Sequence, residues 1–407
     1  MLGERIRKRR KQKKMTLEAL AGTELTKGML SLIENNKAKP SMESLSYIAE
    51  RLEVDLSDLL EEIDSGELRG ILEQAEKIYN TIGLTDKYKQ LIKIIDPYVS
   101  SLSQGYETAR LLEIYSYSLY YEKKQDWQEP LNRAAKIYDQ MNISSNRAFI
   151  GIFRSTIKFK EHDYSKSLEI ILNERKEIEA THAYIDPLAR LSLDYHEAIL
   201  YFAVGDSQSA TETIEKALTL SKEKRIFYLI DDLYRLAAAQ AMTEQDHAKK
   251  QYYLTKLRQY GEFADHLSSL HFCELIEIIT MIMEKQLYNE ALTRIEQYLS
   301  NADKIHFHEP WFYLEKGKAL YYLKYYEEAL LTFNKVVIPE NIHHPFDLSM
   351  FYVMDSYKAL IQLELGQTID AQTTIKKAVQ NFEPLLETPF KQFNREAFRK
   401  INQTISN

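Results

Sequence analysis

The sequence predicts an all-α protein, and three observations carry that prediction. The 407 residues include only 12 glycines and 9 prolines against 28 tyrosines and 16 phenylalanines, so turn-forming residues are scarce. Near the N-terminus, short stretches with apolar residues at helical spacing follow one another. Further along, a pattern of helix pairs recurs roughly every 40 residues. A chain of this length exceeds one ordinary core, so we expect at least two units.

Three short helices are expected in the N-terminal part, each beginning after a hydroxyl side chain. Thr16, Thr26 and Ser41 directly precede apolar-periodic runs and are the residue types that cap helix N-termini. The turn between the first two helices is about four residues long, which lets one helix brace another in the major groove of DNA. The spacing therefore predicts a helix-turn-helix.

The charge of the chain is divided unevenly. Residues 1–40 contain eleven Lys/Arg and four Asp/Glu, whereas the whole chain has 53 basic and 60 acidic residues and a net charge of −7. The remainder therefore sums to −14. A basic end on an acidic body favours electrostatic steering of that end to a polyanion.

The run LSLIENNKAKPS, preceded by TLEALA and GERIR, resembles the Xre/Cro repressor family over roughly residues 2–62. The resemblance implies a five-helix DNA-binding domain over residues 1–64, with its recognition helix starting at Thr26. It also implies DNA contacts from the first two helices, the recognition helix and the residues that follow it: Arg5, Thr16, Thr26, Lys27, Gly28, Met29, Ser31, Asn35, Lys37 and Lys39. The alternative is a small helical bundle with no role on DNA.

Two of these positions depart from the family pattern. Leu17 stands where the family usually has a glutamine that contacts phosphate, and Gly28–Met29 replace residues that are often polar. Lys27 can donate to guanine or phosphate, but Met29 offers only apolar contact, for example with a thymine methyl group. Direct base readout is therefore expected to be sparse, and Gly28 is interpreted as permitting close backbone approach to DNA.

Past residue 65 the repeat places a small residue four positions before a bulky apolar one. The phrases GDSQSATETIEKAL, KQLYNEALTRIEQYL, LKYYEEALLTFNKVV and LGQTIDAQTTIKKAV align Ala210, Ala291, Ala329 and Ala371, followed by Ile214, Ile295, Phe333 and Ile375. Weaker copies place Gln90, Pro130, Ser167 and Ala248 in the same slot.

This periodicity resembles tetratricopeptide repeats, in which Gly317 and Ala329, twelve residues apart, would make the tight contact between paired helices. The resemblance implies about eight helix pairs over residues 67–383, stacked as a right-handed solenoid. Residues 384–407, with Phe390, Phe393, Ile401 and Ile405, are expected to form a capping helix. Residues 65–72 are expected to hold a linker and the start of the first repeat helix, and Gly66 and Gly70 make that linker either a hinge or a plain loop.

An Xre-type domain joined to tetratricopeptide repeats resembles the RRNPP family of Gram-positive quorum-sensing regulators. The resemblance implies transcription regulation in the cytoplasm by a homodimer that binds an operator in double-stranded DNA and senses a short imported signalling peptide. The alternative function is a protein-interaction scaffold that captures a response regulator or another protein, with or without DNA binding.

The resemblance places a peptide against the first helix of each pair. Counting from the aligned alanines gives these candidate contacts: Tyr195, Gln240, Thr280, Lys318, Tyr321 and Asp355. Family members often hold the peptide backbone with asparagines on these helices, but none occurs within 191–204, 226–241, 270–284, 311–324 or 348–363. The alternative is that most of the tyrosines pack between helices.

Signals for catalysis are weak, so we expect neither an enzyme nor a cofactor. No glycine-rich phosphate loop or G-x-S-x-G motif occurs, and Cys273 in an apolar helical stretch is interpreted as a core residue. The pairs His306/His308 and His343/His344 lack the ligand spacing of a zinc site, so no metal is expected. A single cysteine excludes an internal disulfide, and no signal peptide or apolar run of membrane-spanning length is found.

Overall fold

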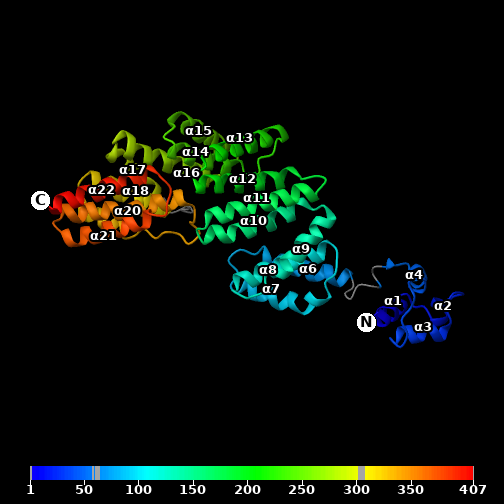
Figure 1. The fold of residues 1–407 in the computed structure, drawn as a ribbon. Helices are drawn as coiled ribbons and strands as arrows, with labels where there is room; N and C mark the ends of the chain where they lie inside the picture. The colour runs from blue at the N-terminus through cyan, green and yellow to red at the C-terminus, as the bar shows by residue number, and fades with distance from the viewer. Residues whose placement is uncertain (1, 57–58, 60–64, 301–307, 407) are drawn as a thin grey trace. The chain divides into compact units, whose positions relative to one another are not determined.

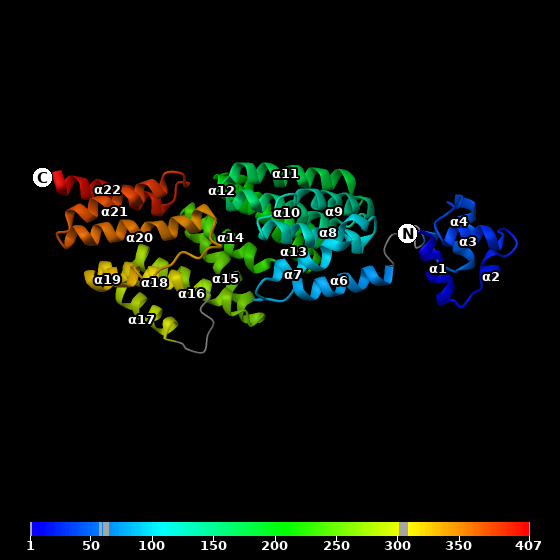
Figure 2. The same ribbon diagram turned by 90° about the horizontal axis from the view of Figure 1, so that it is seen from below.

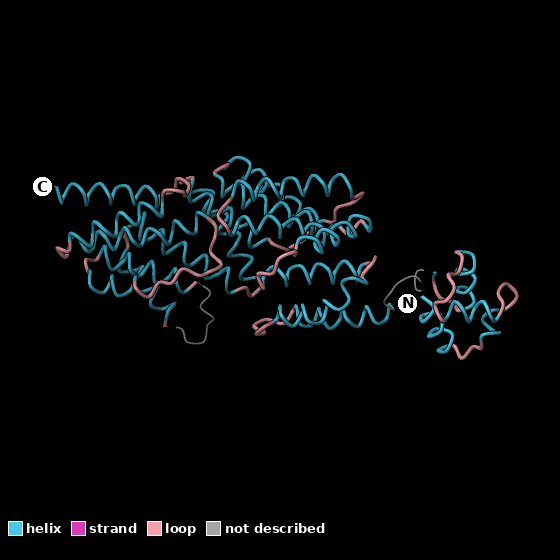
Figure 3. Tube along the Cα trace, turned by 60° about the horizontal axis from the view of Figure 1, so that its bottom comes forward, coloured by secondary structure: helices cyan, strands magenta, loops and turns pink. Residues whose placement is uncertain are grey.

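The computed structural model describes residues 2–56, 59, 65–300 and 308–406 (Figure 1), and all regular structure in these ranges is helical. The tube drawn in Figure 3 shows helices joined by loops, with no strand among the described residues. The predicted all-α fold, a helix-turn-helix domain followed by helical repeats, is confirmed. The chain divides into two compact units, residues 1–150 with 181–184 and residues 151–180 with 185–407, and each is described by itself.

The N-terminal domain contains four described helices: α1 (Leu2–Gln12), α2 (Leu17–Ala21), α3 (Lys27–Glu34) and α4 (Met42–Arg51). All three predicted caps are confirmed, because the side-chain oxygens of Thr16, Thr26 and Ser41 accept the backbone N–H groups three residues ahead. The expected fifth helix falls after Leu56, where all residues up to Ser65 except Leu59 lie outside the described residues.

The core of this domain is made by apolar side chains that recur at helical spacing. The side chains buried in it are Ile6, Leu20, Ala21, Leu30, Ile33, Leu45, Ile48, Ala49, Leu52 and Leu59. Helices α1 and α3 approach closely at Gly3, where a Cβ would lie 2.0 Å from the carbonyl oxygen of Ile33. The first helix is therefore fixed directly against α3.

The rest of the first unit holds α6 (Ser65–Tyr79), α7 (Lys87–Ile95), the 3-10 helix η1 (Asp96–Ser101), α8 (Tyr106–Tyr121) and α9 (Gln128–Met141). Residues 65–72, where a linker was expected, form the first two turns of α6, and Gly70 is helical. Helix α10 (Ser144–Lys160) begins in this unit and continues into the second.

The second unit continues the pairs after α10. Its helices are α11 (Tyr164–Thr181), α12 (Pro187–Val204), α13 (Ser207–Lys224), α14 (Ile230–Thr243), α15 (His247–Phe263), α16 (Leu267–Thr280), the π-turn η2 (Met281–Lys285), α17 (Tyr288–Leu299), α18 (Glu309–Tyr322), α19 (Tyr326–Phe333), α20 (Pro345–Glu364), α21 (Thr368–Phe382) and α22 (Pro389–Ser406). Within the described residues, α6 to α21 make eight consecutive helix pairs. None of the described helices is long and apolar enough to span a lipid bilayer.

The aligned small residues occupy the helix–helix contacts of the repeat. Ala210, Ala291, Ala329 and Ala371 are fully buried, as are the apolar residues four positions later. The predicted alignment of the small-residue position was wrong for two of the weaker repeat copies, because Gln90 and Ala248 are exposed. In α7 the buried position is Leu91, one residue later.

In α15 the buried position is Lys250, two residues after Ala248. Its Nζ lies 2.6 Å from Glu284 Oε1 and 3.2 Å from Thr280 Oγ1. A lysine can be buried when its charge is paired. Lys250 therefore occupies the buried repeat position of α15, which a pattern of small residues does not identify.

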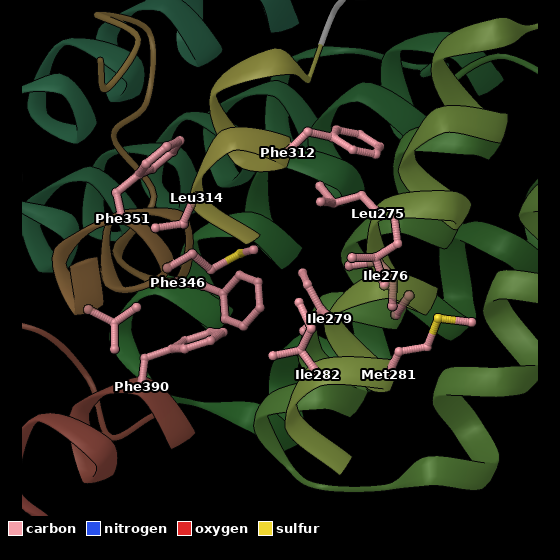
Figure 4. Close-up of a cluster of buried hydrophobic side chains, with 14 of the residues drawn as sticks. Leu275, Ile276, Ile279, Met281, Ile282, Phe312, Leu314, Phe346, Phe351 and Phe390 are labelled. Atoms are coloured by element: carbon pink, nitrogen blue, oxygen red, sulfur yellow. The ribbon is translucent and has the colours of Figure 1, made fainter. Parts of the chain in front are cut away.

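Helix α22 follows the last helix pair. It packs against α20 and α21, and Figure 2 shows the three helices side by side. Phe390 and Ile401 are buried, Phe393 is partly buried, and Ile405 is exposed. In the core beside it, Phe346 of α20 and Phe390 of α22 lie next to each other and face Ile279 and Ile282 (Figure 4), with the two ring centroids 6.1 Å apart.

Substituting Gly317 tests the tight contact inside the pair α18–α19. A Cβ at Gly317 would lie 2.4 Å from the ring of Phe333, which is fully buried. We expect Gly317→Val to lower the free energy of unfolding by about 2–3 kcal/mol, because the ring has little room to move. Gly70→Val is the matched control, since nothing lies within 4 Å of its Cβ position. Equal urea midpoints for the two variants would contradict the contact.

Candidate DNA interface and ligand groove

The first turn of α3 is open to solvent. Thr26, Lys27, Gly28 and Met29 are exposed, and Ser31 is half-buried. Lys27 is ion-paired with Glu18 of α2, and both side chains are more than half exposed. An exposed pair of this kind contributes little stability. Lys27 can therefore exchange Glu18 for a phosphate or a base edge at little cost.

Gly28 is not required by packing inside the domain. A Cβ at Gly28 would meet only Thr26 Oγ1, at 4.0 Å. A glycine inside a helix costs about 1 kcal/mol relative to alanine, and here no internal contact offsets that cost. The open surface is compatible with close approach of an external partner to the α3 backbone.

The other predicted DNA-contacting residues fall into two groups. Lys37 and Lys39 are exposed in the loop after α3, and Asn35 donates its side-chain N–H to the carbonyl of Ser31 at 2.8 Å. Arg5 is half-buried, and its Nε donates to the carbonyl of Leu59 at 3.0 Å. Arg5 therefore ties the first helix to the end of the domain, whatever else its remaining N–H groups contact.

Two sets of hydrogen bonds between α1 and the α3 region were not predicted from the sequence. Arg10 holds Glu34 with two hydrogen bonds, Nε to Oε1 at 2.6 Å and Nη2 to Oε2 at 2.8 Å, and Glu34 is 3% exposed. The side chain of Asn36, in left-handed conformation, accepts the backbone N–H of Gly3 at 2.9 Å. Both contacts orient α3 and the loop after it against α1.

The second unit contains a cavity of about 320 Å³, walled by helices that open the successive pairs and by the loop before α20. Its lining is largely aromatic and aliphatic, with a few polar groups: Phe159, Tyr195, Ile199, Phe202, Asp232, Arg235, Leu236, Ala239, Phe272, Leu275, Ile276, His308, Trp311, Asn341, His343, His344, Phe346, Asp347 and Met350. We call this cavity the groove. Apolar walls with a few placed polar groups are typical of ligand sites.

The loop before α20 is pinned to helices far away in the sequence. His344 Nε2 lies 3.3 Å from the carbonyl oxygen of Ile199 on α12, and Nδ1 accepts the backbone N–H of Phe346 at 3.2 Å. Tyr164 of α11 donates to the carbonyl of His343 at 2.7 Å. These bonds fix one wall of the groove.

The histidines of the groove are poor cations. Burial lowers the pKa of His344 to about 4, and burial together with the nearby Arg235 lowers that of His308 to about 4. The pKa of His343 is also lowered, chiefly by burial and then by His162. At neutral pH these side chains therefore act as neutral hydrogen-bonding groups.

A second cavity of about 270 Å³ lies further along α14 and α16. Phe346 lines both cavities, so they share this ring as a wall. The polar groups of the second cavity include Lys250 and Glu284, the pair described above.

Of the predicted peptide contacts, only Tyr195 lines the groove. Gln240 is buried and donates to the carbonyl of Ser207, and Thr280 donates to the carbonyl of Ile276. Lys318 is buried against Glu315, Tyr321 packs among aromatic rings, and Asp355 is ion-paired with Lys377.

The other groove residues lie about one or two helical turns N-terminal to the predicted ones. Arg235 precedes Gln240, Trp311 precedes Lys318, and Asp347 precedes Asp355. The sequence signal that points to them is the start of each first helix, marked by Pro345 for α20 and by Glu309–Pro310 for α18.

These features define a helix-turn-helix domain joined to a helical-repeat domain that encloses an apolar groove. Residues 3–65 match a family model described as a helix-turn-helix domain, as predicted. No curated protein sequence matches the chain.

Among solved structures, PlcR of Bacillus thuringiensis in complex with the peptide PapR7 and DNA matches with 18% identity and a TM-score of 0.38, covering 67% of this chain and 98% of that chain. The SHP pheromone receptor Rgg2 of Streptococcus dysgalactiae matches with 16% identity and a TM-score of 0.32, over 67% of this chain and 98% of that chain. ComR of S. thermophilus with DNA and its signalling peptide ComS matches with 12% identity and a TM-score of 0.23, over 99% and 100%.

Proposed function

We propose that the protein is a cytoplasmic transcription regulator, not an enzyme, that binds operator DNA through α3 and senses a short signalling peptide in the groove. The observation that carries the DNA part is the helix-turn-helix match over residues 3–65, whose recognition helix presents Thr26, Lys27, Gly28 and Met29 to solvent. The basic excess of residues 1–40 supports the same assignment, because phosphate neutralisation supplies most non-specific affinity.

The groove supports the peptide part. Its aromatic side chains come from several helices and offer stacking and apolar contact, while Asn341 and the neutral histidines offer hydrogen bonds. A peptide can regulate DNA binding only if it binds one arrangement of the chain better than another. We propose a twofold homodimer for two reasons. One small DNA-binding domain buries too little surface on DNA to select an operator sequence, and paired operator half-sites require twofold symmetry.

Charge reversal at Lys27 tests the DNA assignment. Fluorescence anisotropy with the DNA upstream of the chain's own gene should show affinity for wild-type protein at physiological salt and about tenfold or greater loss for Lys27→Glu. The variant is expected to remain folded, because a glutamate in the first turn of a helix is compatible with the helix dipole.

Lys93→Glu makes the same charge change at an exposed site in α7 and is expected to bind like wild type. If wild type and Lys27→Glu bind equally weakly, the regulator proposal is contradicted. The protein-interaction scaffold, with a response regulator or another protein as partner, then becomes the favoured function.

A further inference from the structure

One carboxylate of the groove has no neutralising partner in the described part of the chain. Asp347 is the third residue of α20 and lines the groove, and no residue in the described ranges forms a hydrogen bond or ion pair with its oxygens. Burial raises the pKa of this side chain to about 6, so it is still mostly ionised at neutral pH. Asp347 is half-buried, and an ionised carboxylate that is partly withdrawn from water is costly unless a partner supplies the missing charge.

The guanidinium in the described lining of the groove belongs to Arg235; its Nη atoms contact residues other than Asp347, and its Nε has no hydrogen-bond partner among the described residues. Arg235 donates to Asp231 at 3.0 Å, and its Nη1 lies 3.8 Å from Asp232 Oδ1. Asp231 and Asp232 lie on the same helix as Arg235. The single positive charge of Arg235 is therefore shared between two carboxylates, and Asp347 adds a third negative charge. Burial and the neighbouring Asp231 raise the pKa of Asp232, and Arg235 opposes that shift.

The remaining polar groups do not add positive charge. The groove histidines are neutral at pH 7 for the reasons given above, and the pKa of Tyr195 is raised by burial and by the nearby Asp232. The described lining therefore has an excess of negative charge beside aromatic rings, among them Trp311 and Phe159. Aromatic faces and carboxylates both attract cations.

A structural role of Asp347 predicts something different. A carboxylate in the first turn of a helix interacts favourably with the helix dipole whether or not a ligand is present. Such a role affects the stability of α20 but gives no preference among ligands. The two roles are therefore separable by measuring binding selectivity.

We propose that the groove selects a cationic peptide, an otherwise apolar chain with one ammonium or guanidinium group that is received by Asp347 with Asp232 alongside. This inference rests on the proposed function and specifies the chemistry of its ligand.

The test uses seven-residue peptides of mixed leucine, valine and phenylalanine sequence with acetylated and amidated ends, so that the peptide ends carry no charge. One position in turn carries lysine, its uncharged analogue norleucine, or glutamate, and binding to the full-length protein is measured by isothermal titration calorimetry. At the best position we expect lysine peptides to bind about tenfold tighter than norleucine peptides, the worth of one charge-assisted hydrogen bond. Asp347→Asn should reduce that ratio to about one.

Asp370→Asn is the matched control, because Asp370 lies in the first turn of α21 and is exposed. It should retain the full preference for lysine. Equal binding of lysine and norleucine peptides, tighter binding of glutamate peptides, or a preference that persists in Asp347→Asn overturns the cationic selection but leaves peptide sensing standing. Absence of binding in all three series overturns both this inference and the proposed peptide sensor.

Discussion

Glu34→Ala is expected to unfold the N-terminal domain while leaving the repeat helices folded. The substitution leaves the guanidinium of Arg10 at a nearly closed site without the carboxylate that accepts two of its hydrogen bonds. Breaking a buried ion pair by removing one partner costs about 3–5 kcal/mol. A domain of about 60 residues has a total stability of roughly 3–9 kcal/mol, so the loss is comparable to the whole.

Hydrogen exchange read by mass spectrometry can follow both parts of the molecule in one sample. Amides of α3 should lose most of their protection in Glu34→Ala, whereas amides of α14 serve as the internal reference. Glu24→Ala, at an exposed position of the same domain, should leave α3 protected. The double variant Arg10→Met/Glu34→Leu should regain protection, because apolar replacements of similar size remove both buried charges. Unchanged protection of α3 in Glu34→Ala would refute the importance of the pair.

This pair also marks the boundary of what the sequence can predict. The caps at Thr16, Thr26 and Ser41 were predictable because a cap depends on residues three positions apart. The buried alanines of the repeat were predictable for the same reason, since the slot is defined within one helix pair. Arg10 and Glu34 are 24 positions apart, and a basic run beside a DNA-binding motif favours phosphate contact. Only the packing of α1 on α3 shows that one of its arginines faces inward.

The groove was harder to predict because several repeats build it together. Phe159, Arg235 and Asp347 come from α10, α14 and α20, and the loop that holds His343 and His344 is fixed to α11 and α12. Periodicity identifies the first helix of each pair but not the turn of that helix that lines a cavity. The position along the helix depends on how neighbouring pairs stack and where the loops pass.

Lys318 is an example of a residue on a correctly identified helix but on a turn that does not line the groove. Substituting it is the second change from which we expect a large effect. The sequence suggests a lysine available to a peptide carboxylate, yet Lys318 is 1% exposed and its Nζ lies 2.6 Å from Oε1 of the fully buried Glu315. The Nζ also lies 5.2 Å from the centre of the Phe390 ring. Lys318→Met keeps the length of the side chain but leaves the Glu315 carboxylate without its counter-ion. We expect a loss of about 3–5 kcal/mol at neutral pH in urea denaturation.

The pH dependence separates this effect from a simple packing defect. Burial already raises the pKa of Glu315 above its ordinary value of 4.5, and the attraction of Lys318 opposes that shift. Without Lys318 the pKa rises further, so the folded state holds a proton that the unfolded state releases above about pH 4.5. When the folded state binds more protons, stability falls as the pH rises. Lys318→Met should therefore be less destabilised at pH 5 than at pH 8.

Two further variants complete the argument. Glu315→Gln/Lys318→Met removes the titrating group, so the additional pH dependence should disappear and much of the stability should return, because no buried charge is left unpaired. Lys376→Met, at an exposed site of α21, should change stability by no more than about 0.5 kcal/mol. A lysine reserved for a peptide carboxylate gives the opposite pattern, in which Lys318→Met weakens peptide binding at unchanged stability. That outcome would restore Lys318 to the ligand site and would require the α18–α20 core to open on binding.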